Sequence, residues 1–247
     1  MKLVCVALVC GANLAAADDV KVLAGSAVDT SFAVLIPRYE RASGDKVLFD
    51  GDGAIGQMAK RVEAGEAADV LVVSRPQIEA LEQKGHLVPG TARVIGRMGV
   101  GVFVRKGAPK PDISTPQAFK STMLAAKSIG YNDPALGAPV SLYLLGLFER
   151  MGIAGEMKQK TVVFRQRSER FAPVARGEVE IGFNQLGEII VQPGIDLVGP
   201  LPAPIQNYTV FTAAVVAAGR QPQAAKRFID FIASRDAAAV LRAKGFE

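Results

Sequence analysis

The sequence has no tryptophan, a single histidine (His86) and two cysteines, Cys5 and Cys10, both within the first ten residues. A structural or catalytic zinc site needs several His or Cys ligands, so these counts argue against one. No Gly-x-Ser-x-Gly elbow, Walker-type loop or dinucleotide-binding fingerprint after a strand is present, so nothing indicates a hydrolase, an NTPase or a dehydrogenase. We therefore expect neither a metal nor a cofactor.

Long hydrophobic runs and clustered charges are also missing. No segment reaches the roughly 18 to 20 consecutive apolar residues that a membrane-spanning helix needs. The net charge of +5 comes from basic residues spread along the chain, and aromatics make up only 6% of it, so no nucleic-acid surface is expected. With 49% apolar residues, the 247-residue chain predicts a soluble protein with one large or two modest domains, here expected to be a monomer.

The first residues have the three parts of a secretory signal. Lys2 precedes an apolar run over residues 3–10, and three alanines end at Ala17. We expect residues 1–17 to be cleaved and the mature protein to be periplasmic, with neither cysteine retained. Cys10 as a lipid-attachment site is the alternative, but Val9 stands where such signals place a small residue.

Strand and helix patterns alternate through the rest of the chain, which favours parallel strands with crossover helices and an α/β fold. Expected strands cover residues 20–23, 46–49, 69–73, 100–104, 128–131, 161–164, 180–184, 196–198 and 207–217. Expected helices cover residues 30–42, 55–63, 76–84, 116–123, 141–151, 168–176, 222–234 and 236–244.

No flexible linker separates the two α/β units, so strands must continue from one unit into the other. We place these crossings near residues 98–104 and 205–210. This predicts one lobe made of residues 18–100 and 207–247, and a second lobe made of residues 101–206. A hinge of two strands lets such lobes close on a ligand.

The first strand runs through Gly25 directly into Ser26 and a helix that starts near Asp29. Unpaired backbone N–H groups at a helix start, next to a hydroxyl and a glycine without a side chain, can receive an anion. The alternative is that Ser26 and Asp29 form only a capping box.

Several segments together resemble a known family. They are residues 23–26, 49–56, 62–74 with its Glu-Ala-Gly-Glu-Ala-Ala-Asp-Val, the Tyr-Asn-Asp-Pro of 131–134, and 228–246. Over nearly all of the mature chain they are similar to periplasmic molybdate-type solute-binding proteins of ABC transporters, which periplasmic aconitate isomerases also resemble. The resemblance implies the two-lobed type II periplasmic binding protein fold. It also implies a small anionic ligand held between the lobes and an ABC transporter permease as partner.

Carried over by position, Ser26 matches the serine of the first lobe that contacts the oxyanion. The second loop of the family maps to residues 51–57, which places Ala54 and Ile55 at the ligand beside Gly25 and Ser26. This loop has no Ser or Thr here, and the late tyrosine of the family falls at Asn184 and Gln185. A tetrahedral oxyanion therefore lacks two of its expected donors.

Arginines in the chain favour carboxylates, because a guanidinium group offers two parallel hydrogen bonds. Arg75 follows the third strand, while Arg165 and Arg167 lie in the turn Phe-Arg-Gln-Arg-Ser-Glu-Arg together with Arg170. We expect Arg75 and at least one of Arg165 and Arg167 to bind the ligand, against the alternative of solvated surface residues. Periodicity does not allow all three arginines of the turn to face one cleft.

Two further positions are expected at the ligand. Ser141 follows a Gly/Pro-rich loop at a helix start, where it either binds the anion or caps the helix. Asn184 and Gln185 follow a strand end, where open α/β sheets bind ligands. Glu188 is interpreted as a structural acid at a helix start.

Two functions fit these residues. The favoured one is a periplasmic protein that captures a di- or tricarboxylate for ABC transport. The alternative is an aconitate isomerase, which shifts an allylic proton between trans- and cis-aconitate and needs one proton carrier. Asp52 serves as that carrier if burial raises its pKa, with Tyr143 and Ser26 as weaker candidates.

Overall fold

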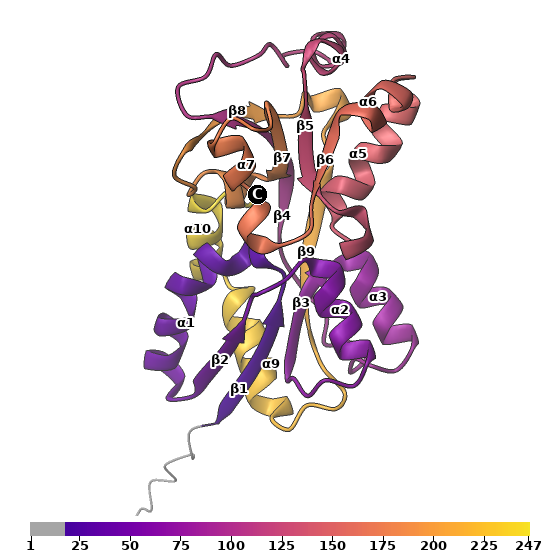
Figure 1. The fold of residues 1–247 in the computed structure, drawn as a ribbon. Helices are drawn as coiled ribbons and strands as arrows, with labels where there is room; N and C mark the ends of the chain where they lie inside the picture. The colour runs from indigo at the N-terminus through magenta and orange to yellow at the C-terminus, as the bar shows by residue number, and fades with distance from the viewer. Residues whose placement is uncertain (1–17) are drawn as a thin grey trace, which may run out of the picture.

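The computed structural model describes residues 18–247, apart from the side chain of Arg167. The predicted signal, with Cys5 and Cys10, lies outside the described residues. The described chain forms a curled sheet with helices on its faces, in the strand order β2-β1-β3-β9-β4-β7-β5-β6, and β8 pairs with β4 beside this path. Figure 1 shows two halves, with β4 and β9 running between them.

The lower half in Figure 1 is built around three parallel strands, β2, β1 and β3, with β9 antiparallel to β3. Short runs of Val, Leu and Phe form these strands. β1, β3 and β9 are largely buried, whereas β2 is the edge strand and its residues are partly or fully exposed. The strands are β1 (Asp19–Ala24), β2 (Lys46–Asp50), β3 (Val70–Ser74) and β9 (Tyr208–Val215). Its helices are α1 (Asp29–Ser43), α2 (Ile55–Glu63), α3 (Arg75–Gln83), α9 (Pro222–Ile232) and α10 (Arg235–Ala243), with the 3-10 turn η1 (Ser26–Val28).

The upper half contains the parallel strands β6, β5 and β7, with β4 antiparallel to β7. Its strands are β4 (Arg93–Arg105), β5 (Ile129–Asn132), β6 (Thr161–Phe164), β7 (Ile181–Gln185) and β8 (Ile195–Pro200). Its helices are α4 (Pro116–Ala125), α5 (Pro139–Arg150), α6 (Ala154–Lys160), α7 (Ala172–Ala175) and α8 (Leu186–Ile189). Three 3-10 turns complete it: η2 (Pro134–Leu136), η3 (Arg167–Glu169) and η4 (Ala203–Ile205).

Strand β4 takes part in both halves. Up to Gly99 it pairs with β9, and from Val100 onward it pairs with β7. At this change of partner the side-chain amide of Gln206 accepts from the Val100 N–H at 2.9 Å and donates to the Val100 carbonyl at 3.0 Å, and this carbonyl also accepts the Leu201 N–H at 3.1 Å. The change falls within the first of the two crossings that the sequence predicts, and the mixed α/β fold is confirmed.

Each half has its own apolar core. In the lower half the buried face of α1 packs on α9, where the Phe228 ring lies edge-on to Phe32 and Tyr39, with ring centroids 5.9 and 5.1 Å away. In the upper half Phe119 of α4 packs on Phe183 of β7. A smaller cluster gathers around Phe103 of β4 and includes Val174 of α7 and Ile189 of α8. Aromatic pairs of this geometry add to the stability gained by burying their area.

Most expected elements are present, shifted by a residue or two, and two differ more. β4 begins at Arg93, well before residue 100, because the half of the strand that pairs with β9 carries exposed Arg and Val side chains that hide its pattern. The helix expected over 168–176 is split into η3 and α7, since Pro173 fits only the first turn of a helix. The short helices α6 and α8 are not among the expected ranges. Within residues 18–247 no helix is long and apolar enough to cross a bilayer.

Candidate functional site

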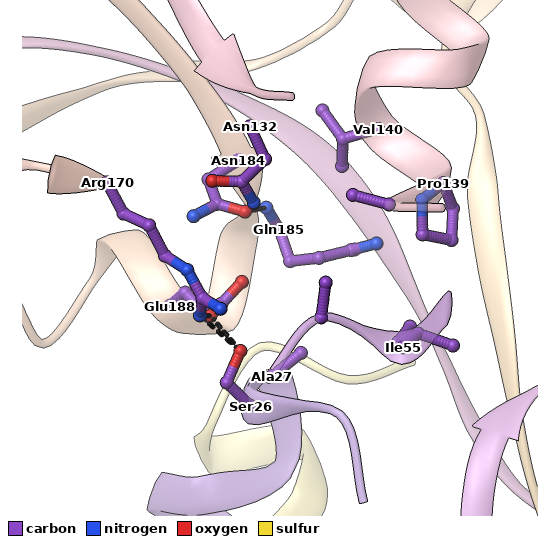
Figure 2. A pocket seen from close by; sticks show the side chains of 12 residues that line it. Ser26, Ala27, Ile55, Asn132, Pro139, Val140, Arg170, Asn184, Gln185 and Glu188 are labelled. Carbon is purple, nitrogen blue, oxygen red and sulfur yellow. Dashed lines mark hydrogen bonds and ion pairs between the residues drawn. The ribbon is translucent and has the colours of Figure 1, made fainter. Parts of the chain in front are cut away.

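A cleft lies where the carboxyl ends of β1, β2, β5 and β7 meet, between the two halves. This is the position at which α/β sheets hold ligands, because the loops that follow parallel strands converge there. Figure 2 shows side chains from both halves pointing into it. The lining residues are Ser26, Ala27, Ala54, Ile55, Asn132, Ala138, Pro139, Val140, Arg170, Asn184, Gln185 and Glu188.

The cleft is narrow in this structure. The volume in it that can hold the centre of a water-sized sphere is about 20 Å³, which gives room for about one water molecule but not for an organic acid. The two halves also meet at its rim, where Gly56 of α2 lies against the backbone of Leu136 and Gly137. The structure therefore shows a closed arrangement of the two halves.

Ser26 connects the two halves at the cleft. It is 8% exposed and its backbone N–H donates to the Gly53 carbonyl at 3.1 Å, so its hydroxyl is the group directed at the opposite half. That hydroxyl donates to Glu188 Oε1 at 2.8 Å and accepts a hydrogen bond from Arg170 Nη1. Figure 2 shows the three side chains meeting at one point.

Arg170 and Glu188 form a buried ion pair on the wall opposite Ser26. Arg170 Nη1 lies 3.0 Å from Glu188 Oε1, and the side chains are 7% and 11% exposed. Burying two charges costs desolvation energy, which their attraction and the Ser26 hydroxyl offset. Removing one partner of such a pair costs about 3 to 5 kcal/mol, because the other charge is left buried and unpaired.

The loop from β2 into α2 is held by the carboxylate of Asp50, which forms an ion pair with Arg61. Asp50 accepts from the Asp52 N–H at 3.1 Å and from Arg61 Nη2 at 2.6 Å, and the Arg61 hydrogen bond holds the pKa of Asp50 below its usual value. At the helix start Gln57 Oε1 accepts from the Ala54 N–H at 2.8 Å. The loop thereby directs the first turn of α2 toward the cleft, where Ala54 and Ile55 line it.

The start of α5 faces α2 across the cleft, after the loop that follows β5. Pro139 occupies the first turn, where its missing N–H costs nothing, and Ala138 and Val140 line the cleft on either side of it. Two helices of 9 and 12 residues therefore turn their positive ends to the same space. Ser141 is fully buried, does not line the cleft, and donates to the Ala138 carbonyl at 3.2 Å.

The end of β7 carries Asn184 and Gln185, which both line the cleft and are 2% and 4% exposed. Asn184 Oδ1 accepts from the Gln185 N–H at 2.9 Å, and Gln185 Nε2 donates to Thr209 Oγ1 at 2.7 Å. Gln185 Oε1 is buried without a hydrogen-bond partner among the described residues. Buried polar atoms in proteins are nearly always satisfied, so this oxygen is available to a donor.

Several expected site residues lie outside this cleft. The Arg75 side chain is 62% exposed and pairs with Glu79 at 2.8 Å on its own helix, and the Arg165 side chain is 72% exposed and pairs with Asp133 at 3.2 Å. The side chain of Arg167 is not among the described ones. Asp52 is exposed, so the burial that its proposed role requires is absent here. Gly25 is buried behind Ile55, whose side chain leaves no room for a Cβ on this glycine.

Three polar residues that line the cleft were not among the expected ligand residues. Glu188, interpreted from the sequence as a structural helix-start acid, lies three residues after Gln185 and reaches the cleft from α8. Arg170 follows a 3-10 turn instead of a continuing helix, which carries it to the cleft. Asn132 ends β5, and its position before an Asp-Pro turn is the signal that marks it.

Residues that hold a metal ion were also sought. Among residues 18–247, no group of three or more His, Cys, Asp or Glu side chains converges in a way that would do so.

Comparison with known proteins decides the family. The family model for bacterial extracellular solute-binding proteins matches residues 20–247. The chain belongs to this family. One relative of this solute-binding protein is an aconitate isomerase from Pseudomonas sp., 32% identical over 230 residues, which cover 92% of this chain and 86% of the relative. Another is the molybdate-binding protein ModA of Azotobacter vinelandii, 24% identical over 97% of this chain and 92% of the relative.

The solved structures agree on the fold of this solute-binding protein. The periplasmic molybdate-binding protein of Azotobacter vinelandii matches with a TM-score of 0.77 and 18% identity, over 92% of this chain and 98% of that one. The fold is therefore the two-lobed type II periplasmic binding protein fold, as the sequence predicts. The family and its relatives also support an extracellular or periplasmic location and the setting of an ABC transporter.

Proposed function

We propose that this solute-binding protein captures a small organic anion with two or three carboxylates between its halves and delivers it to an ABC transporter permease. The observation that carries the proposal is Arg170, a guanidinium group buried in the cleft and hydrogen-bonded to Ser26 of the opposite half. Its planar fork of donors matches a carboxylate, and a group buried at this depth is screened little by water.

The ligand carboxylates that Arg170 does not bind have other groups of the cleft available to them. The first turns of α2 and α5 offer backbone N–H groups and the positive ends of two helix dipoles. Asn132 and Asn184 add side-chain amides on the wall formed by β5 and β7. The polar groups of the cleft are thus spread along it, which suits an extended polycarboxylate better than a compact ion.

Binding requires the halves to separate first, since the cleft holds about 20 Å³. Strands β4 and β9 connect the halves and give the motion its axis, as in hinge closure around ligands. Closing afterwards removes water from the ligand and strengthens each charge-assisted hydrogen bond. We expect the protein to be a monomer. We also expect its two proposed lobes, residues 18–100 with 207–247 and residues 101–206, to move as two rigid bodies.

The test is calorimetry on the mature protein with trans-aconitate, cis-aconitate, tricarballylate and molybdate. We expect saturable binding of at least one carboxylate and a loss of at least tenfold in affinity in Arg170→Gln. The matched control is Arg75→Gln, which removes an exposed arginine outside the cleft and should bind as the unchanged protein does. Binding of molybdate with no response to any carboxylate contradicts the proposal.

A second candidate is isomerisation of aconitate, favoured by the 32% identity to the aconitate isomerase from Pseudomonas sp.. The reaction removes a proton from the methylene carbon and adds a proton to the CH carbon of the alkene. The double bond then joins the former methylene carbon to the central carbon, and the proton carrier ends in its starting protonation state. A general base must reach the substrate carbon. The carboxylate that lines the cleft is Glu188, whereas Asp52 is exposed.

Chromatography of purified mature protein incubated with trans-aconitate separates the candidates. Formation of cis-aconitate establishes the isomerase, and saturable binding without conversion favours the carrier. Turnover lost in Asp52→Asn but kept in Glu188→Gln assigns the proton to Asp52, and the opposite pattern assigns it to Glu188. Ser141→Ala is the control, because its hydroxyl bonds within its own helix turn.

A further inference from the structure

The carboxylate of Glu188 stands where an anionic ligand has to bind. It reaches the cleft from the short helix α8, and its Oε1 atom receives both the Ser26 hydroxyl at 2.8 Å and Arg170 Nη1 at 3.0 Å. The same hydroxyl and guanidinium are the donors that an incoming anion would use. The protein thus holds an acidic group of its own against its anion-binding donors.

The charges of the cleft therefore cancel. Arg170 and Glu188 are the charged side chains among the described residues that line it, and the others are Ser, Asn, Gln and apolar residues. With side chains 7% and 11% exposed, the pair is screened little by water or salt. An anion next to Arg170 gains one attraction and meets one repulsion at nearly the same distance.

The shape of the anion decides how large that repulsion becomes. A tetrahedral dianion such as molybdate or sulfate carries both charges within one small sphere, so bonding to Arg170 brings both close to Glu188. A di- or tricarboxylate places one charge at Arg170 and the others several ångströms away, toward the first turns of α2 and α5. The repulsion then acts on a single charge.

We propose that Glu188 is a specificity-determining residue, which excludes compact divalent oxyanions from this cleft and leaves it to carboxylates whose charges are spread along the molecule. The inference rests on the proposed function, because it names the class of anion that the same site accepts. Molybdate is then disfavoured for two reasons. The second loop lacks hydroxyl donors for it, and Glu188 repels it.

The test compares three proteins, the unchanged chain, Glu188→Gln and Glu188→Asp, by calorimetry with sodium molybdate, sodium sulfate and trans-aconitate at fixed pH and ionic strength. Gln keeps an oxygen that accepts from Ser26 and Arg170 but carries no charge, and Asp keeps the charge. We expect molybdate or sulfate to bind at least tenfold more tightly to Glu188→Gln, and neither ion to gain affinity in Glu188→Asp. Glu178→Gln is the control, since Glu178 is exposed and pairs with Arg176 far from the cleft.

The outcomes separate the inference from the function it rests on. Tighter dianion binding in Glu188→Gln supports the inference even if no carboxylate binds, which would refute the proposed ligand class alone. Carboxylate binding without any dianion gain in Glu188→Gln overturns the inference alone. Tight molybdate binding by the unchanged protein overturns the inference, and it overturns the proposed function as well when no carboxylate binds. Circular dichroism checks folding, and Glu188→Ala, with the same expected gain, replaces a Gln variant that does not fold.

Discussion

Gly56 and Gly137 meet backbone to backbone across the cleft. A Cβ atom on Gly56 would lie 2.7 Å from the Gly137 Cα and 2.5 Å from the Leu136 carbonyl oxygen. Gly56 sits in the first turn of α2, and Gly137 ends the turn before α5 with a φ of 69°, a conformation that favours glycine. The closed arrangement depends on the absence of both side chains.

Replacing Gly56 by Ala tests this dependence. The added methyl group has no space in the closed form, because its neighbours are backbone atoms, so the halves are held apart. We expect ligand affinity to fall at least tenfold and small-angle scattering to report a larger radius of gyration with ligand present. Stability should be unchanged or higher, because Ala is a better helix former than Gly by about 1 kcal/mol.

Gly155→Ala is the matched control for this change. Gly155 lies in α6, where nothing stands within 4 Å of an added Cβ, so affinity and scattering should match those of the unchanged protein. A Gly56→Ala variant that closes and binds normally would show that the rim contact is not needed.

Ser26→Ala removes the hydroxyl that joins the two halves while leaving the ion pair of Arg170 and Glu188 in place. One hydrogen bond contributes about 1 kcal/mol, so we expect ligand affinity to fall about fivefold. Ser141→Ala should change it much less, because the Ser141 hydroxyl bonds to Ala138 and does not face the cleft. Calorimetry with the same carboxylate distinguishes them. An equal loss in both variants would return Ser141 to the ligand site.

Glu66 should make stability depend on pH in acid. Hydrogen bonds from Arg61 and then Lys21 lower its pKa from 4.5 to about 2. A depressed folded pKa stabilises the native state above the unfolded pKa, and this contribution is lost as the pH falls from about 4.5 through 2. Since 32% of the side chain is exposed, we expect about 1 kcal/mol.

Urea unfolding at pH 6 and pH 3 measures this dependence. Glu66→Gln should lower the free energy of unfolding at pH 6 and reduce the difference between the two pH values. Glu79→Gln, which removes an exposed acid from a single surface pair with Arg75, should have little effect. An unchanged pH dependence in Glu66→Gln would contradict the prediction.

Asp69 is a buried carboxylate that holds two segments together. It is 5% exposed, and it accepts from the Lys21 N–H at 2.8 Å and from the N–H groups of Arg220 and Gln221 at 2.7 and 2.8 Å. An Asn side chain turns an NH₂ group toward at least one of these donors. We expect Asp69→Asn to lower the free energy of unfolding by about 1 to 3 kcal/mol.

Asp196→Asn is the control for this substitution, because Asp196 accepts one backbone N–H, that of Gly107, at an exposed loop. Its unfolding midpoint in urea should stay close to that of the unchanged protein. If both variants lose the same stability, burial of the Asp69 cluster is not the cause.

The sequence predicts where the cleft lies better than which charges line it. Strand ends are visible as β-branched runs followed by polar residues, so Ser26, Asn184 and Gln185 were expected at positions that line the cleft. Arg75 follows a strand too, but it bonds to Glu79 one turn along its own helix. A single sequence does not show which of the two directions such a long side chain takes.

Arg170 and Glu188 were harder to find because the elements next to Arg170 and around Glu188 are short. Helix α8 has four residues and η3 has three, too few for a periodic pattern to tell one face from another. Their pairing across 18 residues depends on tertiary packing between α7 and α8 around Phe103, which no local pattern records.

At the connection between the halves the Val100 N–H donates to the Gln206 side chain, while the Val100 carbonyl accepts both from Gln206 and from the backbone N–H of Leu201. A backbone acceptor for the Val100 N–H would fix two strands in register, whereas a side-chain amide on rotatable bonds can follow this N–H as the strand twists. We therefore expect the Val100 N–H to stay hydrogen-bonded while the angle between the two halves changes. Amide exchange at Val100 should consequently respond to ligand more than exchange in the strands on either side.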